Sequence, residues 1–298
     1  MPESAHSASP SADIPSADNP SAESPYATPR HGLELEDCGF YHAIDIPGVG
    51  LQKGLWDLRA TVGSYLGEYD AFSGKRVLEV GCANGFLSFH MESKGAEVVA
   101  YDLCENDRWD VMPYARWNTA AAASYAGTEN WRQWSEHRSS NLRRLNNAFW
   151  FTHAAFESKV RLVHGNAYQV PKTIGYVDLC TFGSILLHLR DPFQALYRGT
   201  RLAREAVIVT DLMPKRPGAE VDSGDCAYFL PDAAKSEPAD SWWHLTPGLV
   251  VRMLGVLGFE EAEIRPFQQP HNGGVAPMYA VVAKRTSPIE DLADMEED

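Results

Sequence analysis

The sequence predicts a doubly wound α/β fold, in which helices cover both faces of a mostly parallel sheet. Short apolar runs alternate with segments of helical character through residues 75–285. A turn of small residues follows the first apolar run, at residues 81–85, and an acid, Asp102, ends the second. Because parallel strands need crossover connections, this alternation is typical of sheets that bind a ligand at the carboxyl ends of their strands.

The elements follow from the chain in order. Residues 75–80 form a short buried-strand candidate, residues 84–94 a helix closed by Gly95, and residues 96–102 a second strand. Short apolar runs that end at turn residues are typical of strands. The other strand candidates are residues 159–165, 176–182, 205–211, 259–267 and 276–285, and further helices are expected at residues 191–203 and 247–257. The candidates predict a seven-stranded sheet.

The acidic charge is concentrated at the two ends of the chain. Residues 1–29 contain four acids, residues 287–298 contain six, and neither stretch has Lys or Arg. Subtracting these ten acids from the net charge of -14 leaves -4 for residues 30–286. The first stretch repeats Ser, Ala and Pro, so we expect disordered tails at residues 1–36 and 287–298 around one folded domain, 37–286. The lack of a basic stripe argues against a nucleic-acid partner.

Composition limits the cellular setting. No apolar stretch approaches the roughly 18 to 20 residues that a membrane helix needs. The first residues also lack the basic and apolar segments of a secretory signal. The five cysteines form no C-x-x-C pair, which predicts reduced thiols and neither a disulfide scaffold nor a metal site. We therefore expect a cytoplasmic monomer or homodimer that acts on a small molecule.

The turn after the first strand has features of a nucleotide site. Its small residues let the backbone pass close to a ligand, and Asn84 can cap the helix that follows. Asp102 lies 21 positions after Gly81, the spacing at which an acid accepts hydrogen bonds from a ribose. In a G-x-G-x-x-G motif, glycines would replace Ala83 and Phe86, and no G-K-[ST] of a P-loop follows. A nucleoside cofactor without a pyrophosphate remains.

The segment VLEVGCANGFLS, residues 77–88, resembles the first motif of the class I S-adenosylmethionine-dependent methyltransferases. HGNAYQVP (164–171) is similar to their adenine-flanking segment, and YVDLCTFGSILLHLRDP (176–192) to the strand and loop that face the sulfonium and the acceptor. The resemblance spans about residues 40–285 and implies their Rossmann-like fold, with S-adenosylmethionine as cofactor. The cofactor-binding residues that it implies are Glu79, Gly81, Ala83, Asn84, Gly85, Asp102, Leu103, Asn166, Ala167, Phe182 and Gly183.

Three further segments, residues 43–59, 183–196 and 241–259, resemble the catalytic domain of the tRNA wobble-uridine carboxymethyltransferases and their small-molecule relatives. The tRNA enzyme has a tyrosine where this chain has Leu187, and a lysine upstream of its first motif that holds an extra carboxylate. Residues 33–50 contain no Lys or Arg. These departures favour ordinary S-adenosylmethionine and a small acceptor. Wobble-uridine modification and a non-catalytic cofactor-binding protein remain as alternatives.

His188 follows the fourth strand, at the place where the acceptor is expected. It is the candidate catalytic residue, a general base that removes a hydroxyl proton, since an unperturbed imidazole has a pKa of about 6.5. The alternative is that its ring only holds the loop. The loop lacks the [DNS]-P-P-[YF] signature of methyltransferases that act on base or glutamine nitrogens, so oxygen is favoured over nitrogen.

Two inserts are expected to set the specificity for the acceptor. Residues 104–158 exceed a simple crossover and predict a helical cap that carries five tryptophans. These tryptophans either attach the cap to the body or form an aromatic lid. Four arginines of the insert either meet a carboxylate or phosphate or face solvent: Arg132, Arg138, Arg143 and Arg144. A second, loop insert spans about residues 212–245. The candidate substrate-binding residues are Tyr41, His42, Trp56, Trp242, Trp243 and His244.

Overall fold

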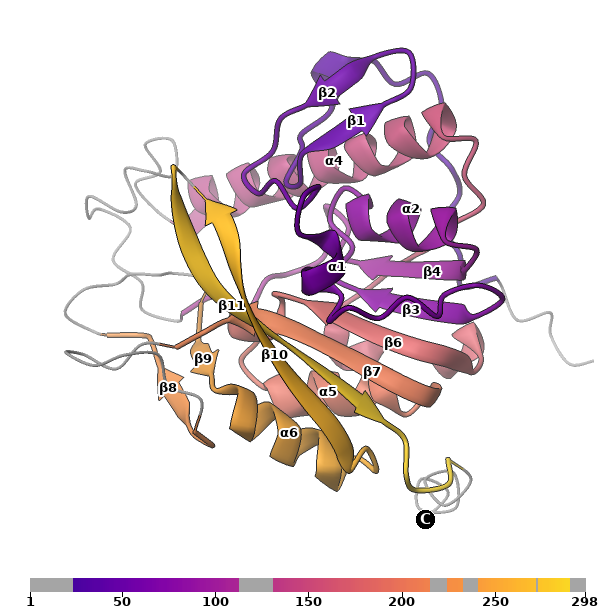
Figure 1. Cartoon of the computed structure of the whole chain (residues 1–298). Coiled ribbons are helices and arrows are strands. Elements are labelled where there is room, and N and C mark those ends of the chain that lie inside the picture. Colours follow the sequence, from indigo (N-terminus) through magenta and orange to yellow (C-terminus); the bar gives the residue numbers. More distant parts are fainter. Residues whose placement is uncertain (1–23, 113–130, 215–223, 233–240, 272, 290–298) are drawn as a thin grey trace, which may run out of the picture.

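The fold is seen in a computed structural model that describes residues 24–112, 131–214, 224–232, 241–271 and 273–289. Its centre is a seven-stranded sheet in the order β10-β11-β7-β6-β3-β4-β5 (Figure 1). Neighbouring strands from β7 to β5 pair in parallel, and only β11 runs against the others. The strands are β3 (Arg76–Val80), β4 (Glu97–Asp102), β5 (Arg161–His164), β6 (Val177–Gly183), β7 (Ala203–Leu212), β10 (Glu261–His271) and β11 (Gly274–Lys284). The predicted doubly wound sheet is confirmed.

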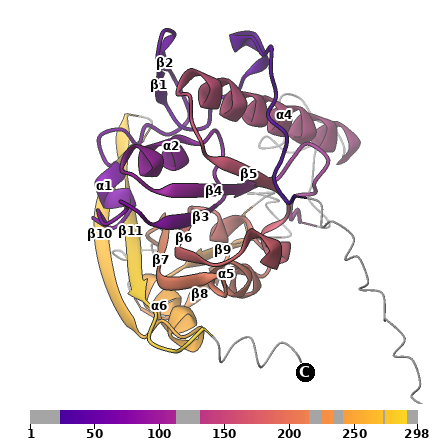
Figure 2. The same ribbon diagram turned by 90° about the vertical axis from the view of Figure 1, so that its right-hand side faces the viewer.

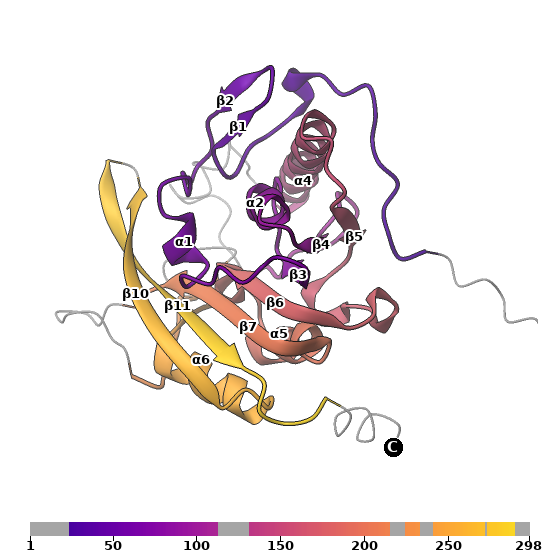
Figure 3. The same ribbon diagram turned by 45° about the vertical axis from the view of Figure 1, so that its right-hand side comes forward.

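Helices cover both faces of this sheet. Figures 2 and 3 show α2 (Phe86–Ser93) and α4 (Trp131–Ala155) on one side, and α5 (Pro192–Thr200) and α6 (Pro247–Val256) on the other. Successive strand residues therefore enter different cores, as the two-residue period of a strand requires. On β7, Val207 joins the core under α5 and α6, whereas Ile208 joins the core under α2 and α4.

Two small hairpins and several short helices complete the described structure. β1 (Ile44–Ile46) pairs with β2 (Gly50–Gln52), and β8 (Ala227–Phe229) pairs with β9 (Trp243–Leu245), both antiparallel. The short α1 (Val62–Tyr65) precedes β3. The 3-10 helices are η1 (Leu35–Asp37), η2 (Ala167–Gln169), η3 (Lys172–Ile174) and η4 (Leu186–His188). None of the helices in the described ranges combines the length and apolar character that a bilayer crossing requires.

The helices that follow β6 and β9 begin where local sequence dictates. The Asp191 side chain accepts a hydrogen bond from the Gln194 amide at 2.9 Å, and Pro192 occupies the first turn of α5. Thr246 caps α6 in the same way, followed by Pro247. A capping oxygen satisfies a free amide of the first turn, and proline fits there because its missing N–H has no helical partner.

The long helix α4 lies in the segment for which the sequence predicts a cap. Its C-terminal half covers the sheet, where Phe149 and Trp150 are buried and the rings of Phe149 and Phe89 are 5.3 Å apart. This part serves as the crossover helix between β4 and β5. Trp117 lies outside the described residues, and the extent of a cap over residues 104–158 stays a prediction.

Residues near both ends of the described structure make contacts that the sequence does not predict. The Ala27 amide donates to the Leu162 carbonyl oxygen at 2.7 Å, and Arg30 donates to Glu105 at 2.7 Å. At the other end Ile289 is buried. The prediction of a disordered tail therefore needs correction for residues 24–36 and 287–289. Composition indicated too little apolar surface, but a strand-edge hydrogen bond and an ion pair hold the first segment, and the Ser287 amide donates to the Gly258 carbonyl oxygen at 3.2 Å in the second.

Candidate functional site

The turn between β3 and α2 forms one wall of the site. Gly81, Ala83 and Gly85 have φ angles of 88°, 51° and 83°, so all three occupy the left-handed region. A side chain at Gly81 would also overlap the side chain of Ile185. Glycine adopts this conformation without steric cost, which explains why positions 81 and 85 are occupied by glycine. The turn therefore lies close against the loop that follows β6.

Asp102 closes the turn from the end of β4. One carboxylate oxygen accepts a hydrogen bond from the Ala83 amide at 2.6 Å, and the other accepts one from the Leu103 amide at 2.7 Å. Burial raises the pKa of Asp102 to about 6, and the two backbone amides oppose this rise. Above that pH the group is a carboxylate held in place by backbone donors. The Cys82 thiol is a further hydrogen-bond partner of this carboxylate, which still has capacity to accept a hydrogen bond from a ligand hydroxyl.

A cavity of about 380 Å³ lies at the carboxyl ends of β3, β4 and β6. It brings together residues that are far apart in sequence, as expected for the ligand site of such a sheet. Of the cofactor-binding residues predicted from the sequence, Gly81, Ala83, Asp102, Leu103, Asn166, Ala167 and Gly183 line it. Of the predicted acceptor-site residues, Tyr41, His42 and His188 also line it.

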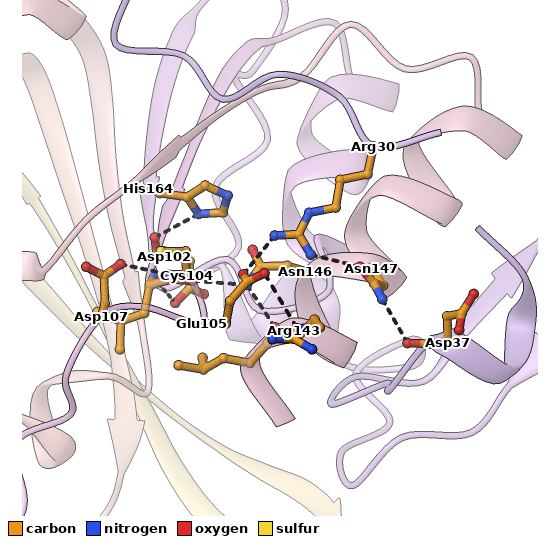
Figure 4. A network of polar contacts seen from close by, with 12 residues as sticks. Arg30, Asp37, Asp102, Cys104, Glu105, Asp107, Arg143, Asn146, Asn147 and His164 are labelled. Atoms are coloured by element: carbon orange, nitrogen blue, oxygen red, sulfur yellow. Dashed lines mark hydrogen bonds and ion pairs between the residues drawn. The ribbon is translucent and has the colours of Figure 1, made fainter. Parts of the chain in front are cut away.

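A polar network holds the segment after β4 from outside the cavity (Figure 4). Arg30 contacts Glu105, and Arg143 approaches the other oxygen of Glu105 at 3.7 Å. Asn146 on α4 donates to the carbonyl oxygen of Leu103 at 3.1 Å. The segment that carries Asp102 and Leu103 is thus fixed by both the N-terminal segment and α4.

Four predicted cofactor residues do not line this cavity. Glu79 is buried below the turn, where the Ser88 hydroxyl donates to its carboxylate and burial raises its pKa to about 7. Phe182 points into the core on the α5 side, beside Gly199. Gly85 lies against the rings of Phe89 and Phe149. The fourth, Asn84, is fully buried.

Asn84 does not cap α2, which corrects the prediction from sequence. The helix begins after Gly85 without a side-chain cap. The Asn84 side chain instead forms hydrogen bonds with the backbone of Tyr41 and His42. An amide that both donates and accepts can pair with an extended backbone. Asn84 therefore joins the turn to the segment before β1.

A second cavity, of about 160 Å³, adjoins the first. The two share Tyr41, His42, Ser184 and His188, so these residues lie at their junction. The remaining lining residues of the smaller cavity are Trp56, Tyr65, Leu187, Leu212 and Met278. Trp56 is thus among the predicted substrate residues that reach a cavity, and its indole stacks on the ring of His271 at 3.8 Å.

The two histidines at the junction differ in environment. His42 is only 6% exposed, burial lowers its pKa to about 4, and its Nδ1 has no hydrogen-bond partner within the described ranges. His188 ends η4, and its backbone amide donates to the Ile185 carbonyl oxygen at 3.0 Å. Its Nδ1 lies 3.5 Å from the Ser241 hydroxyl oxygen. His42 is therefore neutral at physiological pH and His188 has a partner in the second insert.

The other predicted substrate residues lie outside both cavities. The Trp242 indole donates to the Asp110 carbonyl oxygen at 3.0 Å, and the Trp243 indole donates to that of Arg190 at 3.2 Å. His244 pairs with Tyr228 across β8 and β9. These contacts attach the second insert to the rim of the larger cavity.

Sequence reasoning missed the residues that close the larger cavity from the first insert. The Asp110 carboxylate accepts hydrogen bonds from the Tyr168 hydroxyl and from the Arg190 amide, the latter at 2.8 Å. The Arg138 guanidinium lies 4.8 Å from the Trp109 ring centre and 5.0 Å from that of Trp134. The sequence left two roles each for Arg138 and Trp109, a contact with the ligand or a purely structural one. Nothing in the local sequence distinguishes Asp110 from the other acids of this segment. Other missed lining residues include Tyr65, Tyr101, Arg108, Ser184 and Ile185.

Comparison with known proteins adds structural relatives only. No protein-family model and no curated protein matches the chain. The N-terminal domain of EvdMO1, crystallised in the presence of SAH and D-fucose, is 17% identical with a TM-score of 0.50, over 84% of this chain and 93% of that chain. A second structure of this domain has SAH bound, with the same identity and TM-score, and covers 84% of this chain and 92% of that chain. Magnesium protoporphyrin IX methyltransferase from Synechocystis PCC 6803, with bound SAH, has 15% identity and a TM-score of 0.45, over 76% of this chain and 81% of that chain. The EvdMO1 likeness shows that the fold is Rossmann-like.

Proposed function

We propose that this protein is an S-adenosylmethionine-dependent methyltransferase that methylates an oxygen of a small molecule. The observation that carries this proposal is the larger cavity, where the glycine turn, Asp102 and the Asn166–Ala167 segment converge. It is supported by the SAH that the EvdMO1 domain binds, because that domain has this fold.

The lining residues fit the chemistry of this cofactor. Asp102 is a carboxylate with free lone pairs, suited to two ribose hydroxyls. Ala167 offers an apolar contact to an adenine ring, and the turn at Gly81 and Ala83 lines the part of the cavity that would receive the amino-acid portion. When bound, the cofactor supplies a methyl group already activated by the positive sulfur. The remaining task of the protein is to align the acceptor and to exclude water.

We assign to His188 the role of the general base that removes the proton of the acceptor hydroxyl. It lies at the junction of the two cavities, where an acceptor in the smaller cavity would meet a cofactor in the larger. His42 is less suited because its lowered pKa of about 4 makes it a weak base. The competing role for His188 is to hold the loop through Ser241, and the two roles are separable by mutation.

The composition of the smaller cavity favours a plain methyl group over a carboxymethyl group. The transferred group must point toward the acceptor, and a carboxylate there would need a cation. No Lys or Arg occurs among the described lining residues of this cavity. The net charge of -4 over residues 30–286 also favours a small acceptor over tRNA. A non-catalytic role is disfavoured by the adjoining cavity itself.

The experiment uses methyl-labelled S-adenosylmethionine and a fractionated extract of the source cell. We expect the full-length protein to place the label on a small molecule, in a linkage that resists mild alkali as an ether does. Label in the RNA fraction would instead establish the wobble-uridine alternative. Saturable cofactor binding without any labelled product would establish a non-catalytic binding protein.

A further inference from the structure

The smaller cavity has the size of one ring. Its volume is about 160 Å³. An engineered apolar cavity of about 150 Å³ in another protein holds a single benzene molecule. The cavity is therefore too small for a nucleoside or a porphyrin, and it matches a group of six to eight heavy atoms.

Part of the wall of this cavity is apolar. Leu187, Leu212 and Met278 contribute aliphatic and thioether surface, and Leu212 and Met278 are paired neighbours on β7 and β11. Trp56 contributes an indole whose orientation is set by its stack on His271, with an angle of 13° between the rings. A fixed aromatic wall favours a planar ring, which can stack on it or meet it edge to face.

The described lining of the smaller cavity contains no Lys, Arg, Asp or Glu. His42 is neutral at physiological pH because burial lowers its pKa to about 4, and burial also raises the pKa of Tyr65 far above its ordinary value. Away from His188, a carboxylate or ammonium group placed against Trp56, Leu212 or Met278 would lose its hydration without gaining an ionic partner. Such a transfer is strongly unfavourable, so the occupant is uncharged.

The two cavities share polar side chains at their junction, Tyr41, His42, Ser184 and His188. The Tyr65 hydroxyl donates to the Ser184 hydroxyl oxygen at 2.9 Å, which leaves the Ser184 proton able to point to a ligand oxygen. Ser184 has a φ of 52°, a strained value for serine, and its amide donates to the Thr210 carbonyl oxygen at 2.7 Å. Strained residues that the surrounding structure holds in place cluster at functional sites.

We propose that the smaller cavity binds the methyl acceptor as a single uncharged planar ring that carries a hydroxyl group, phenol being the simplest case. The hydroxyl lies at the junction, where Ser184 donates to its oxygen and His188 accepts its proton. The ring lies against Trp56, Leu212 and Met278. This assignment rests on the proposed function, because it places the cofactor in the larger cavity.

The test measures binding of 4-fluorophenol to the SAH-saturated protein by fluorine NMR. We expect saturable line broadening, and Leu212→Trp should weaken binding by about tenfold or more because the indole fills the cavity. Val275→Trp is the matched control, since Val275 lies on β11 with 65% of its surface exposed and lines neither cavity. Calorimetry should give the same SAH affinity for both variants.

A second variant guards against misfolding of the first. Leu212→Ala enlarges the cavity and should bind 6-fluoro-2-naphthol more tightly than the wild type does, by about tenfold, as a second ring gains apolar contacts. The claim that the occupant is uncharged is tested with 4-fluorobenzamide and 4-fluorobenzoate, which have nearly the same shape but differ in charge. The benzoate should bind about tenfold more weakly or worse.

Three results would overturn the ring assignment. They are no binding of 4-fluorophenol to the wild type, unchanged binding to Leu212→Trp, or equal binding of the benzoate and the benzamide. The proposed function fails differently, through an absence of SAH binding in calorimetry. The two failures are therefore distinguishable, because cofactor binding and ring binding are measured separately.

Discussion

The side chain of Asn84 makes two hydrogen bonds to the backbone of His42, accepting from its amide at 2.7 Å and donating to its carbonyl oxygen at 3.1 Å. It also accepts from the Tyr41 amide at 3.1 Å. Asn84 belongs to the glycine turn of the larger cavity, and His42 lines both cavities. The residue thus couples the cofactor turn to the segment that closes the acceptor cavity.

Replacing Asn84 by alanine should remove this coupling. Two buried backbone groups of His42 and the partly buried Tyr41 amide would lose their partner, so we expect Asn84→Ala to lower the free energy of unfolding by about 1–3 kcal/mol. SAH affinity should fall as well. Urea unfolding and calorimetry measure the two effects. Asn141→Ala is the matched control, because Asn141 is exposed on α4 and its side chain forms a hydrogen bond with His137 at 3.0 Å. Equal effects of the two variants would contradict the coupling.

The contact of Arg30 with Glu105 and Asn147 should make the N-terminal segment part of the folded unit. The side chains of Arg30 and Glu105 are 28% and 18% exposed. We expect Arg30→Ala to lower the free energy of unfolding by about 1 kcal/mol, since partly buried charged hydrogen bonds exceed surface pairs. Arg59→Ala removes an exposed ion pair with Asp57 and should cost about half of that or less. If Arg30→Ala leaves urea unfolding unchanged, the segment does not contribute to stability.

Buried Glu79 should make stability depend on pH. Burial raises its pKa from 4.5 in the unfolded chain to about 7. Its stabilising contribution is therefore complete below about pH 4.5 and is lost as the pH rises through about 7. Glu79→Gln keeps an acceptor for Ser88 but does not titrate.

The comparison of the two proteins isolates this group. His42 has the opposite sign, since its lowered pKa adds stability as the pH rises from about 4 to 6.5, but it is present in both proteins. Wild-type stability minus that of Glu79→Gln should fall between pH 4.5 and 7, by an amount on the order of 3 kcal/mol. A difference that stays constant with pH would show that Glu79 does not titrate in this range.

His188→Gln should separate the catalytic from the structural role of His188. If His188 is the general base, its replacement should lower turnover by about a hundredfold or more. The acidic limb of the rate profile should disappear, while SAH affinity and melting temperature stay unchanged. His90→Gln, on α2 and lining neither cavity, is the control. Parallel losses of stability and cofactor affinity would assign His188 to holding the loop.

The sequence was informative where local pattern decides the outcome. Buried strands such as β7 and β11 contain continuous apolar runs, at residues 206–209 and 278–283. Asp102 could be predicted to line the cavity because its place after a strand and its spacing from Gly81 are both local features. Phe182 was misplaced because adjacent residues of a strand face opposite sides, and its side chain enters the α5 core while neighbouring Gly183 lines the cavity.

Long-range partners could not be predicted in this way. The Asn84 side chain is of a type that caps helices, and only the folded chain shows that Tyr41 and His42 lie within its reach. Trp242 and Trp243 are candidate substrate residues by sequence, and in the structure their indoles donate to backbone carbonyl oxygens of the neighbouring loops. A tryptophan that contacts substrate and one that anchors a loop have the same aromatic side chain, so the sequence does not distinguish the two roles. Which role applies depends on the neighbours that the fold supplies.

The most direct test of the central claim is a calorimetric titration of SAH into the wild-type protein and into Asp102→Ala. We predict saturable binding by the wild type and an affinity reduced by about tenfold or more in the variant, because charged hydrogen bonds contribute about 1.5–3 kcal/mol each. Asp178→Ala is the control, since that carboxylate accepts the Arg76 amide at 2.7 Å away from both cavities. Absence of saturable binding, or an unchanged affinity in Asp102→Ala, would contradict the account.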